Sequence, residues 1–133
     1  MQAKNTVLEM TSYKILSFKY EKNKKFNNEQ RELQIPFDFK TRFDKIDEDN
    51  ILAEFLVDIV DEENFPFSLS LDIQGLFKAS KWEEHKEQIE LTISSILFPY
   101  IRALITTLTS TAGEHPITLP IINVATLMRN QKK

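Results

Sequence analysis

The chain of 133 residues contains no cysteine, only two histidines and only two glycines. Without cysteine it can form neither a disulfide nor a thiolate metal site, which fits a reducing compartment. Because His85 and His115 are the only histidines, no histidine-rich metal site is expected either, and no cofactor is predicted. So few glycines also argue against a phosphate-binding loop. We expect Gly75 and Gly113 where a positive φ or a close approach requires them.

The charge and the hydropathy of the chain argue against further classes of protein, namely nucleic-acid-binding, membrane-bound and secreted ones. A net charge of −3 gives no electrostatic reason to expect nucleic acid or an anionic membrane surface as a partner. No run approaches 18 consecutive apolar residues, and the first ten residues lack the apolar core of a signal peptide. A hydrophobic fraction of 41% is enough for a real core in a chain of this length. We therefore expect one domain over residues 1–133, located in the cytoplasm and not inserted in a membrane.

Apolar and polar residues alternate through much of the first 80 residues, which predicts antiparallel strands with one covered face. Such strands are expected at 33–39, 51–60 and 65–74. Pro36 places the first of them at a sheet edge or in a bulge, because proline cannot donate to the ladder. Gly75 is expected to break or bulge the last one.

The stretch 7–20 also predicts a strand, but its apolar residues fall in both phases. Leu8 and Phe18 share one parity, whereas Tyr13 and Ile15 hold the other. A strand that is apolar on both faces is usually central in its sheet or lies at a subunit contact.

From Ser80 the apolar period becomes that of a helix. Ser80 is the expected N-cap, with Glu83 as its capping-box partner, and Gly113 ends the helix. Roughly 30 residues at about 1.5 Å each give about 45 Å. Pro99 should bend this helix or mark a break. The apolar stripe is wide enough for two neighbours and comprises Ile89, Ile93, Ile96, Leu97, Tyr100, Ile101, Leu104, Ile105 and Leu108.

After Gly113 the chain enters an unusually apolar loop, which reads PITLPII at 116–122. Loops are normally polar, so this one is either buried in its own chain or binds another. A short final helix is expected at 124–131, capped by Asn123. The predicted fold is therefore α+β: a four-stranded antiparallel sheet, a long helix, the apolar loop and a short C-terminal helix, with the helices on one face of a meander.

The sequence offers little for catalysis, and we predict that the protein is not an enzyme. No serine stands in a G-x-S-x-G elbow and no H-E-x-x-H motif is present. His115 is expected to form a local hydrogen bond. The carboxylates Asp58, Asp61, Glu62 and Glu63 are expected to form a solvated turn. A small-molecule or hydrolytic domain would need a pocket that joins His115 to a carboxylate.

Motifs in the C-terminal third resemble the signature of SecB, the bacterial protein-export chaperone family. The segment ILFPYIRALI at 96–105 is followed by Gly113-x-x-Pro116 and by LPIINVATL at 119–127. Gly75-Leu76-Phe77 is similar to the tripeptide that closes the family's last strand. The signature positions are Phe98, Pro99, Tyr100, Arg102, Gly113, Pro116, Asn123 and Leu127.

The resemblance implies an ATP-independent holdase that keeps client chains unfolded in hydrophobic grooves. It also implies a homotetramer, a dimer of dimers, in which long helices lie between two sheets. The client-binding residues would be Pro116, Ile117, Leu119, Pro120, Ile121, Ile122, Leu127 and Met128. The oligomer interface would comprise Ile93, Leu97, Tyr100, Ile101, Leu104, Ile105 and Leu108.

The partners implied by the resemblance are unfolded polypeptides and the SecA motor, which acidic residues on the sheet surface would contact; Glu54 and Asp58 are the candidates. Two alternatives remain open. One is a SecB-like chaperone dedicated to a single partner such as an antitoxin. The other is an oligomeric adaptor that is not a chaperone and whose apolar loop is a fixed subunit contact.

Overall fold

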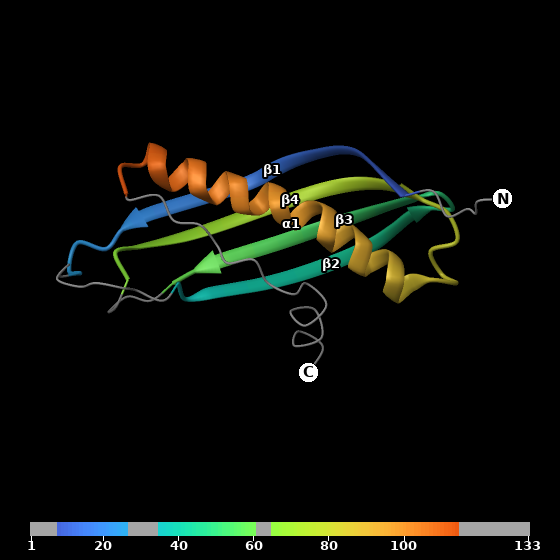
Figure 1. Cartoon of the computed structure of the whole chain (residues 1–133), viewed down its shortest axis with the longest axis horizontal. Helices are drawn as coiled ribbons and strands as arrows, with labels where there is room; N and C mark the ends of the chain where they lie inside the picture. The colour runs from blue at the N-terminus through green and yellow to red at the C-terminus, as the bar shows by residue number, and fades with distance from the viewer. Residues whose placement is uncertain (1–7, 27–34, 61–64, 115–133) are drawn as a thin grey trace.

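Four strands form one antiparallel sheet, and a single long helix crosses one of its faces obliquely (Figure 1). The computed structural model describes residues 8–26, 35–60 and 65–114. The elements are β1 (Leu8–Lys22), β2 (Phe37–Asp47), β3 (Asn50–Ile59), β4 (Phe67–Ala79) and α1 (Lys86–Thr111). This arrangement confirms the predicted α+β class. The predicted apolar loop and short C-terminal helix lie outside the described residues.

The strand order is β1-β4-β3-β2, with every neighbouring pair antiparallel. Strands β2, β3 and β4 form consecutive hairpins, but β1 lies beside β4, so the predicted simple meander is wrong for the first strand. β2 begins directly after Pro36 and lies at a sheet edge, as that proline predicts. β1 forms the other edge, which excludes a central position for it and leaves a subunit contact as the remaining prediction.

Two irregularities in β1 account for its mixed apolar phase. The register against β4 shifts between Met10 and Ser12 and again between Ile15 and Ser17. Each shift adds one residue to β1, and each extra residue moves the following side chains to the opposite face of the sheet. The face toward α1 therefore receives side chains of both parities, namely Leu8, Met10, Tyr13, Ile15, Phe18 and Tyr20.

The core lies between α1 and the inner face of the two central strands. In β3 and β4 every second side chain is buried, and its neighbours on the outer face are mostly half-buried. The largest fully buried side chains of the sheet are Phe55, Phe67, Phe77, Ile51, Ile59, Leu69, Leu71 and Ile73. The period of two in the sequence thus corresponds to one dry face, as predicted.

Gly75 does not break or bulge β4, contrary to the prediction, because the strand continues to Ala79 and keeps its register with β3 as far as Lys78. Phe77 keeps the buried phase. A Cβ at residue 75 would lie 2.8 Å from Cε1 of Phe77 and 3.2 Å from Cδ1 of Leu97. Glycine is therefore required here for the close approach of these two side chains rather than for backbone freedom.

The helix begins at Lys86, and its N-cap, His85, lies five residues after the predicted Ser80 cap. Lys81 takes a left-handed conformation with φ of 58°, and a turn follows in which the His85 amide donates to the Lys81 carbonyl at 3.2 Å. Because of this turn, helical geometry starts only at Lys86, and His85 occupies the N-cap without a side-chain capping bond. The predicted capping box of Ser80 and Glu83 is therefore wrong.

The helix runs from Lys86 to Thr111 and continues through Pro99 without a break. Its C-terminus confirms the role predicted for Gly113, which has φ of 94°. The Gly113 amide donates to the Ser110 carbonyl at 3.1 Å, and the Glu114 amide donates to the Thr109 carbonyl at 3.0 Å. These two bonds form a Schellman motif, in which only glycine takes the left-handed position without strain.

Helix α1 is long and apolar enough to cross a membrane by length and composition alone. One face of this helix is buried in the fold, and the core helix of a soluble protein passes the same test. The apolar character of α1 is therefore explained by its place over the sheet and gives little support to a membrane span.

Candidate functional site

The residues predicted to bind clients, from Pro116 to Met128, lie outside the described residues, as does His115. The structure does describe the place where the chain leaves α1 toward them. This place is residue Glu114, which follows the helix-ending Gly113 and lies beside the C-terminal part of β1.

The side chain of Glu114 is held by two residues of β1. The hydroxyl of Tyr20 donates a hydrogen bond to Oε2 of Glu114. The Nζ atom of Lys22 lies 3.1 Å from the same oxygen and 3.2 Å from Oε1. The Glu114 side chain is only 9% exposed, so this carboxylate is nearly enclosed. The ring of Tyr20 also packs on Phe67 of β4, with 5.6 Å between the ring centroids.

The ionisation of Tyr20 reflects this setting. Its pKa is raised from 10.0 to about 12, first by burial and then by the hydrogen bond to Glu114 and the charge of that carboxylate. The phenol therefore stays protonated and remains a donor across the physiological pH range. Sequence reasoning missed this contact because the two residues are 94 positions apart and neither belongs to a motif.

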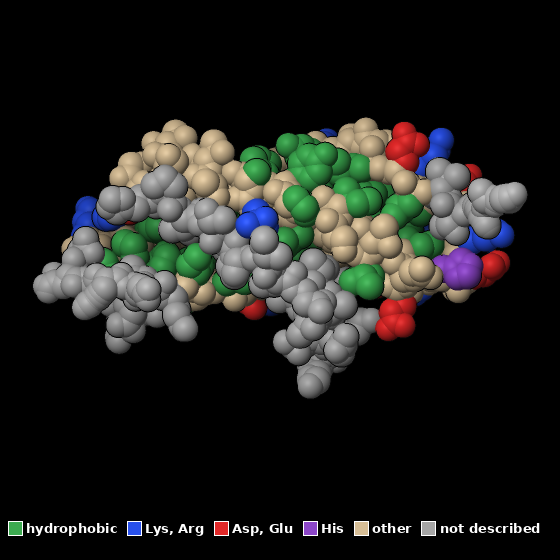
Figure 2. Space-filling model, in the orientation of Figure 1, with side chains coloured by type: hydrophobic (Ala, Val, Ile, Leu, Met, Phe, Trp, Pro, Cys, Tyr) green, Lys and Arg blue, Asp and Glu red, His purple; other side chains and the backbone are tan. Residues whose placement is uncertain are grey.

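A patch of apolar side chains is exposed where α1 passes over β1 (Figure 2). Tyr13 is 39% exposed, Ile15 42% and Tyr100 of α1 41%. The rings of Tyr13 and Tyr100 meet edge to face, with 5.2 Å between their centroids. Because β1 is an edge strand of 15 residues, these side chains border a strand edge that no other described strand pairs with. We call Tyr13, Ile15 and Tyr100 the β1–α1 patch.

The structure divides the residues predicted for the oligomer interface into two groups. Ile93, Leu97, Ile101 and Ile105 have no exposed surface at all and belong to the core of this chain. They therefore have no surface left for a second subunit to bury. Tyr100, Leu104 and Leu108 are exposed or half-buried. A role of these three in an interface stays a prediction.

The outer face of the sheet, opposite α1, contains three carboxylates on the two central strands. Glu54 of β3 forms an ion pair with Arg42 of β2, with 3.2 Å between Oε1 and Nη2. Asp58 accepts a hydrogen bond of 2.6 Å from the Ser70 hydroxyl. Asp72 of β4 has a buried oxygen, Oδ1, that finds no partner among the described residues. Glu54 and Asp58, the SecA candidates, therefore share one face.

Asp72 and Glu54 interact directly. The pKa of Asp72 is raised from 3.8 to about 6, first by burial, then by a hydrogen bond with Glu54 and by the negative charge of Glu54, while Arg42 acts in the opposite direction. Lys19 of β1 and Asp58 join Asp72 in lining a depression of about 250 Å³ on this face. The outer face thus holds a carboxyl group whose pKa lies well above its ordinary value.

The substitution Asp72→Asn is expected to raise the free energy of unfolding at pH 8 and to change it little at pH 4. The folded-state pKa of about 6 exceeds the ordinary value of 3.8. Folding therefore favours the protonated form, and stability falls as the pH rises from about 4 to 6. Asparagine resembles the protonated group, so it removes this loss. The gain should be about 1 kcal/mol, because water screens a half-exposed pair.

Urea unfolding at pH 4, 6 and 8 measures this effect. The control is Asp38→Asn, which changes an exposed carboxylate of the edge strand β2 and should leave the pH profile as in the wild type. An Asp72→Asn variant whose stability differs from the wild type equally at pH 4 and pH 8 would contradict the assignment.

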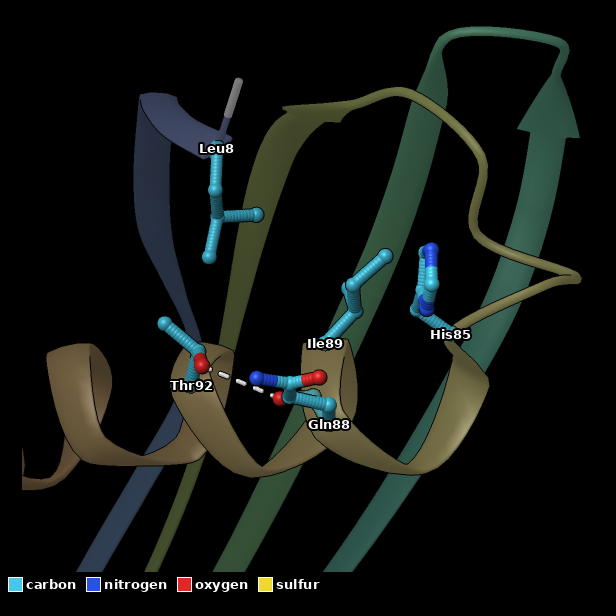
Figure 3. Close-up of a pocket in the computed structure, with 5 residues that line it drawn as sticks. All are labelled: Leu8, His85, Gln88, Ile89 and Thr92. Carbon is cyan, nitrogen blue, oxygen red and sulfur yellow. Dashed lines mark hydrogen bonds between the residues drawn. The ribbon is translucent and has the colours of Figure 1, made fainter. Parts of the chain in front are cut away.

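The other histidine, His85, lies at a cavity of about 230 Å³ near the start of α1 (Figure 3). The remaining lining residues are Leu8 of β1 and Gln88, Ile89 and Thr92 of α1. The hydroxyl of Thr92 donates to the Gln88 carbonyl at 3.0 Å, so it is already paired. Among the described residues, no carboxylate, lysine or second histidine lines this cavity, so none of them offers the imidazole an acid–base partner there. Within the described residues, no three His, Cys, Asp or Glu side chains could hold a metal ion.

The described part of the chain thus combines a four-stranded antiparallel sheet and one long helix with exposed apolar side chains along one strand edge and one helix flank. A family model for SecB, described as a preprotein translocase subunit, matches residues 2–133. The chain belongs to the SecB family, a family of protein-export chaperones. The resemblance based on residues 96–127 is thereby confirmed.

Two proteins are similar to this chain in sequence. An uncharacterized protein of Methanocaldococcus jannaschii is 31% identical over 108 residues, which cover 77% of this chain and 70% of that protein. The protein-export protein SecB of Ehrlichia ruminantium is 34% identical over 67 residues, which cover 50% of this chain and 38% of that protein.

Several solved structures share the fold, including two from Mycobacterium tuberculosis and Streptococcus agalactiae. A SecB-like chaperone of Mycobacterium tuberculosis, solved with a peptide from the HigA1 antitoxin, superposes with a TM-score of 0.61 at 16% identity and covers 86% of this chain and 87% of its own. A protein of unknown function from Streptococcus agalactiae gives a TM-score of 0.59 at 14% identity, with 89% of this chain and all of that chain covered. At such identities the likeness concerns the fold alone.

Proposed function

We propose that this protein is an ATP-independent holdase that binds unfolded or non-native polypeptides in protein export. The observation that carries the proposal is the family match over residues 2–133, which includes the whole apolar segment predicted to contact clients. The described residues add exposed apolar surface. They also include Glu114, a nearly buried carboxylate bound by Tyr20 and Lys22, directly before that segment.

The proposed client-binding residues are apolar and include two prolines, Pro116 and Pro120. Apolar contacts are not directional, so such a surface accepts many sequences with little specificity. Proline lacks a backbone donor and stiffens the chain, so the segment presents side chains with few competing backbone donors. An unfolded polypeptide, which exposes apolar residues and unpaired backbone groups, is the matching ligand.

Self-association and location are further parts of the proposal. The β1–α1 patch together with Leu104 and Leu108 is the proposed contact in a homo-oligomer, a dimer of dimers, because burial of exposed apolar side chains drives association. Glu54 and Asp58 on the outer face are the proposed contact for SecA. We also propose that the protein is located in the cytoplasm, where a client would be held before export.

A second candidate is a chaperone that serves one dedicated partner. The observation that favours it is the solved SecB-like chaperone of M. tuberculosis, which was solved with an antitoxin peptide. Both candidates use an apolar polypeptide as ligand. They differ in breadth: a dedicated chaperone should bind its partner's segment strongly and unrelated unfolded chains weakly.

Fluorescence anisotropy with a labelled, permanently unfolded protein, reduced and alkylated, tests the proposed function without nucleotide. Saturable binding of the unfolded probe, and none of the same protein in its native disulfide-bonded form, is the expected result. Absence of binding to several unrelated unfolded probes, with the chain folded, would exclude the general holdase and leave the dedicated chaperone.

An apolar fluorescent dye separates both chaperones from the adaptor. A chaperone with accessible apolar surface in its native assembly should enhance the dye fluorescence, and an unfolded polypeptide should compete with the dye. An adaptor whose apolar segment is sealed in a subunit contact should give no enhancement until it is dissociated or unfolded.

A further inference from the structure

Asp72 lies near the middle of the outer face, between charged residues of the neighbouring strands. The register places it directly opposite Leu56 of β3 and Ser17 of β1. Its diagonal neighbours on β3 are the carboxylates Glu54 and Asp58. Diagonal neighbours on one face of a sheet are close enough for long or charged side chains to interact. Three carboxyl groups of two adjacent strands therefore share one small area of the outer face.

Basic residues of both edge strands face the same area, but they leave one oxygen of the central carboxyl unpaired. On β1 its diagonal neighbours are Lys14 and Lys19, and both are exposed. On β2, Lys40 is exposed and Arg42 pairs with Glu54 at 3.2 Å. Among the described residues, no group donates a hydrogen bond to the buried Oδ1 atom of the central carboxyl. A buried carboxylate oxygen without a donor disfavours the ionised form.

This setting keeps a proton on Asp72 at a pH where exposed carboxyl groups have lost theirs. Burial is the first cause of its raised pKa of about 6, and the hydrogen bond with Glu54 and the charge of that residue follow. Leu56, directly opposite on β3, contributes to the burial because its side chain excludes water from one side. Between pH 5 and pH 7 the outer face therefore changes by one negative charge per chain.

That single charge decides the sign of the depression on this face. Its charged lining residues are Lys19, Asp58 and Asp72, and Leu56 beside them is 40% exposed. The charges of Lys19 and Asp58 cancel, so the lining is neutral while Asp72 is protonated and has one net negative charge once Asp72 is ionised. A lysine or arginine side chain of a partner is attracted to the second state and not to the first.

We propose that a proton on Asp72 regulates the outer face, so that a cationic polypeptide segment binds there when the proton has left and dissociates when it returns. The proposal rests on the proposed contact of Glu54 and Asp58 with a partner and specifies how that contact is regulated. Asp72 acts through its charge and need not touch the partner. Linkage requires the converse effect as well: the bound cation must lower the pKa of Asp72.

A peptide of five lysines, acetylated and amidated at its ends, is a suitable probe. Its charge is constant between pH 5 and 7.5, and it has no apolar residue that a client-binding surface would select. Its affinity for the full chain is measured by fluorescence anisotropy at low ionic strength across this range. We expect the wild type to bind about three- to fivefold more tightly at pH 7.5 than at pH 5, with half of the change near pH 6.

The variant Asp72→Asn should bind the peptide equally at all these pH values, as weakly as the wild type does at pH 5. The matched control is Asp38→Asn, because Asp38 is an exposed carboxylate of the same face on the edge strand β2. It should keep the pH dependence of the wild type with the same midpoint. Loss of the pH dependence in both variants would overturn the proposal, because the effect would then belong to the charge of the whole face.

The proton itself is observed by carbon-13 NMR of the aspartate carboxyl groups, in which the Asp72 resonance is identified by its loss in Asp72→Asn. We expect this resonance to titrate with a midpoint near pH 6 and the midpoint to fall when the peptide is added. A midpoint that does not move on peptide binding would overturn the proposal. So would an Asp72→Asn variant that retains the pH dependence of peptide binding.

Failure of the underlying contact gives a different result. The wild type would then bind the peptide at no pH, or the substitutions Glu54→Gln and Asp58→Asn together would leave the affinity at pH 7.5 unchanged. Either result would contradict the proposed contact on the outer face, and the regulation of that contact would be overturned with it. If instead the peptide binds in a way that depends on Glu54 and Asp58 but not on pH, only the regulation by Asp72 is overturned.

Discussion

Truncation of Leu97 to alanine is expected to lower the free energy of unfolding by about 3 kcal/mol, the usual cost of removing a fully buried leucine side chain. Leu97 has no exposed surface, and its Cδ1 atom lies close to Gly75 of β4. The loss combines the transfer of the removed methyl groups with the cavity they leave. Urea unfolding at neutral pH, followed by circular dichroism, measures it.

Leu91→Ala is the matched control, because this leucine of the same helix is only half-buried; its loss should be less than about 1.5 kcal/mol. Both variants are compared at two protein concentrations, since a contribution from subunit contacts depends on concentration. If Leu97→Ala cost as little as the control, or if its effect vanished on dilution, the place of Leu97 in the core of one chain would be contradicted.

The double substitution Ile15→Glu/Tyr100→Glu is expected to break the proposed oligomer into smaller species without unfolding the chain. Both residues are more than 40% exposed, so the folded chain can carry charges at these positions. A subunit contact made through the β1–α1 patch would have to bury four carboxylates in each pair of chains, which costs far more than the patch contributes. Light scattering coupled to size exclusion measures the mass.

The control uses two exposed apolar residues away from the patch, Leu56 on the outer face and Ile46 near the β2–β3 hairpin. The variant Leu56→Glu/Ile46→Glu should retain the wild-type mass. If it dissociated while Ile15→Glu/Tyr100→Glu stayed oligomeric, the subunit contact would lie on the outer face or at the hairpin end. A wild type that is already monomeric at high concentration would contradict the proposed self-association itself.

The sequence predicted most of the sheet because a single physical rule governs β3 and β4. A strand covered on one face must alternate, and both strands do so along their whole length. The same rule failed for β1, whose two register shifts change the parity of its inner face. Such shifts depend on the pairing with β4, so the phase of β1 alone could not reveal them.

The order of the strands and the start of the helix could not be predicted from short stretches of the sequence, for a similar reason. Consecutive strands usually neighbour each other, yet β1 pairs with β4. The helix start was misplaced because Ser80 and Glu83 have the spacing of a capping box, whereas the left-handed Lys81 delays helical geometry. In contrast, the end of α1 depends on Gly113 alone, which is why it was predicted correctly.

For the candidate site, the sequence indicated the apolar segment 116–122 but not the contact that Glu114, just before it, makes with Tyr20 of β1. Periodicity finds residues that share a face, and the oligomer prediction therefore grouped buried Ile101 with exposed Tyr100. The hydrogen bond from Tyr20 to Glu114 joins positions that are distant in the chain, and no periodic pattern in the sequence indicates it. Only the arrangement of α1 over the sheet brings the two together.

The central claim is that the protein holds non-native polypeptide through the apolar residues after α1. Its most direct test is light scattering of an aggregating unfolded protein with increasing amounts of this one, without nucleotide, against the variant Leu119→Asp/Ile121→Asp. We predict that the wild type suppresses aggregation and that the variant, folded and with the same mass as the wild type, loses this ability. No suppression by a folded wild type would contradict the claim, and so would suppression that the variant retains in full.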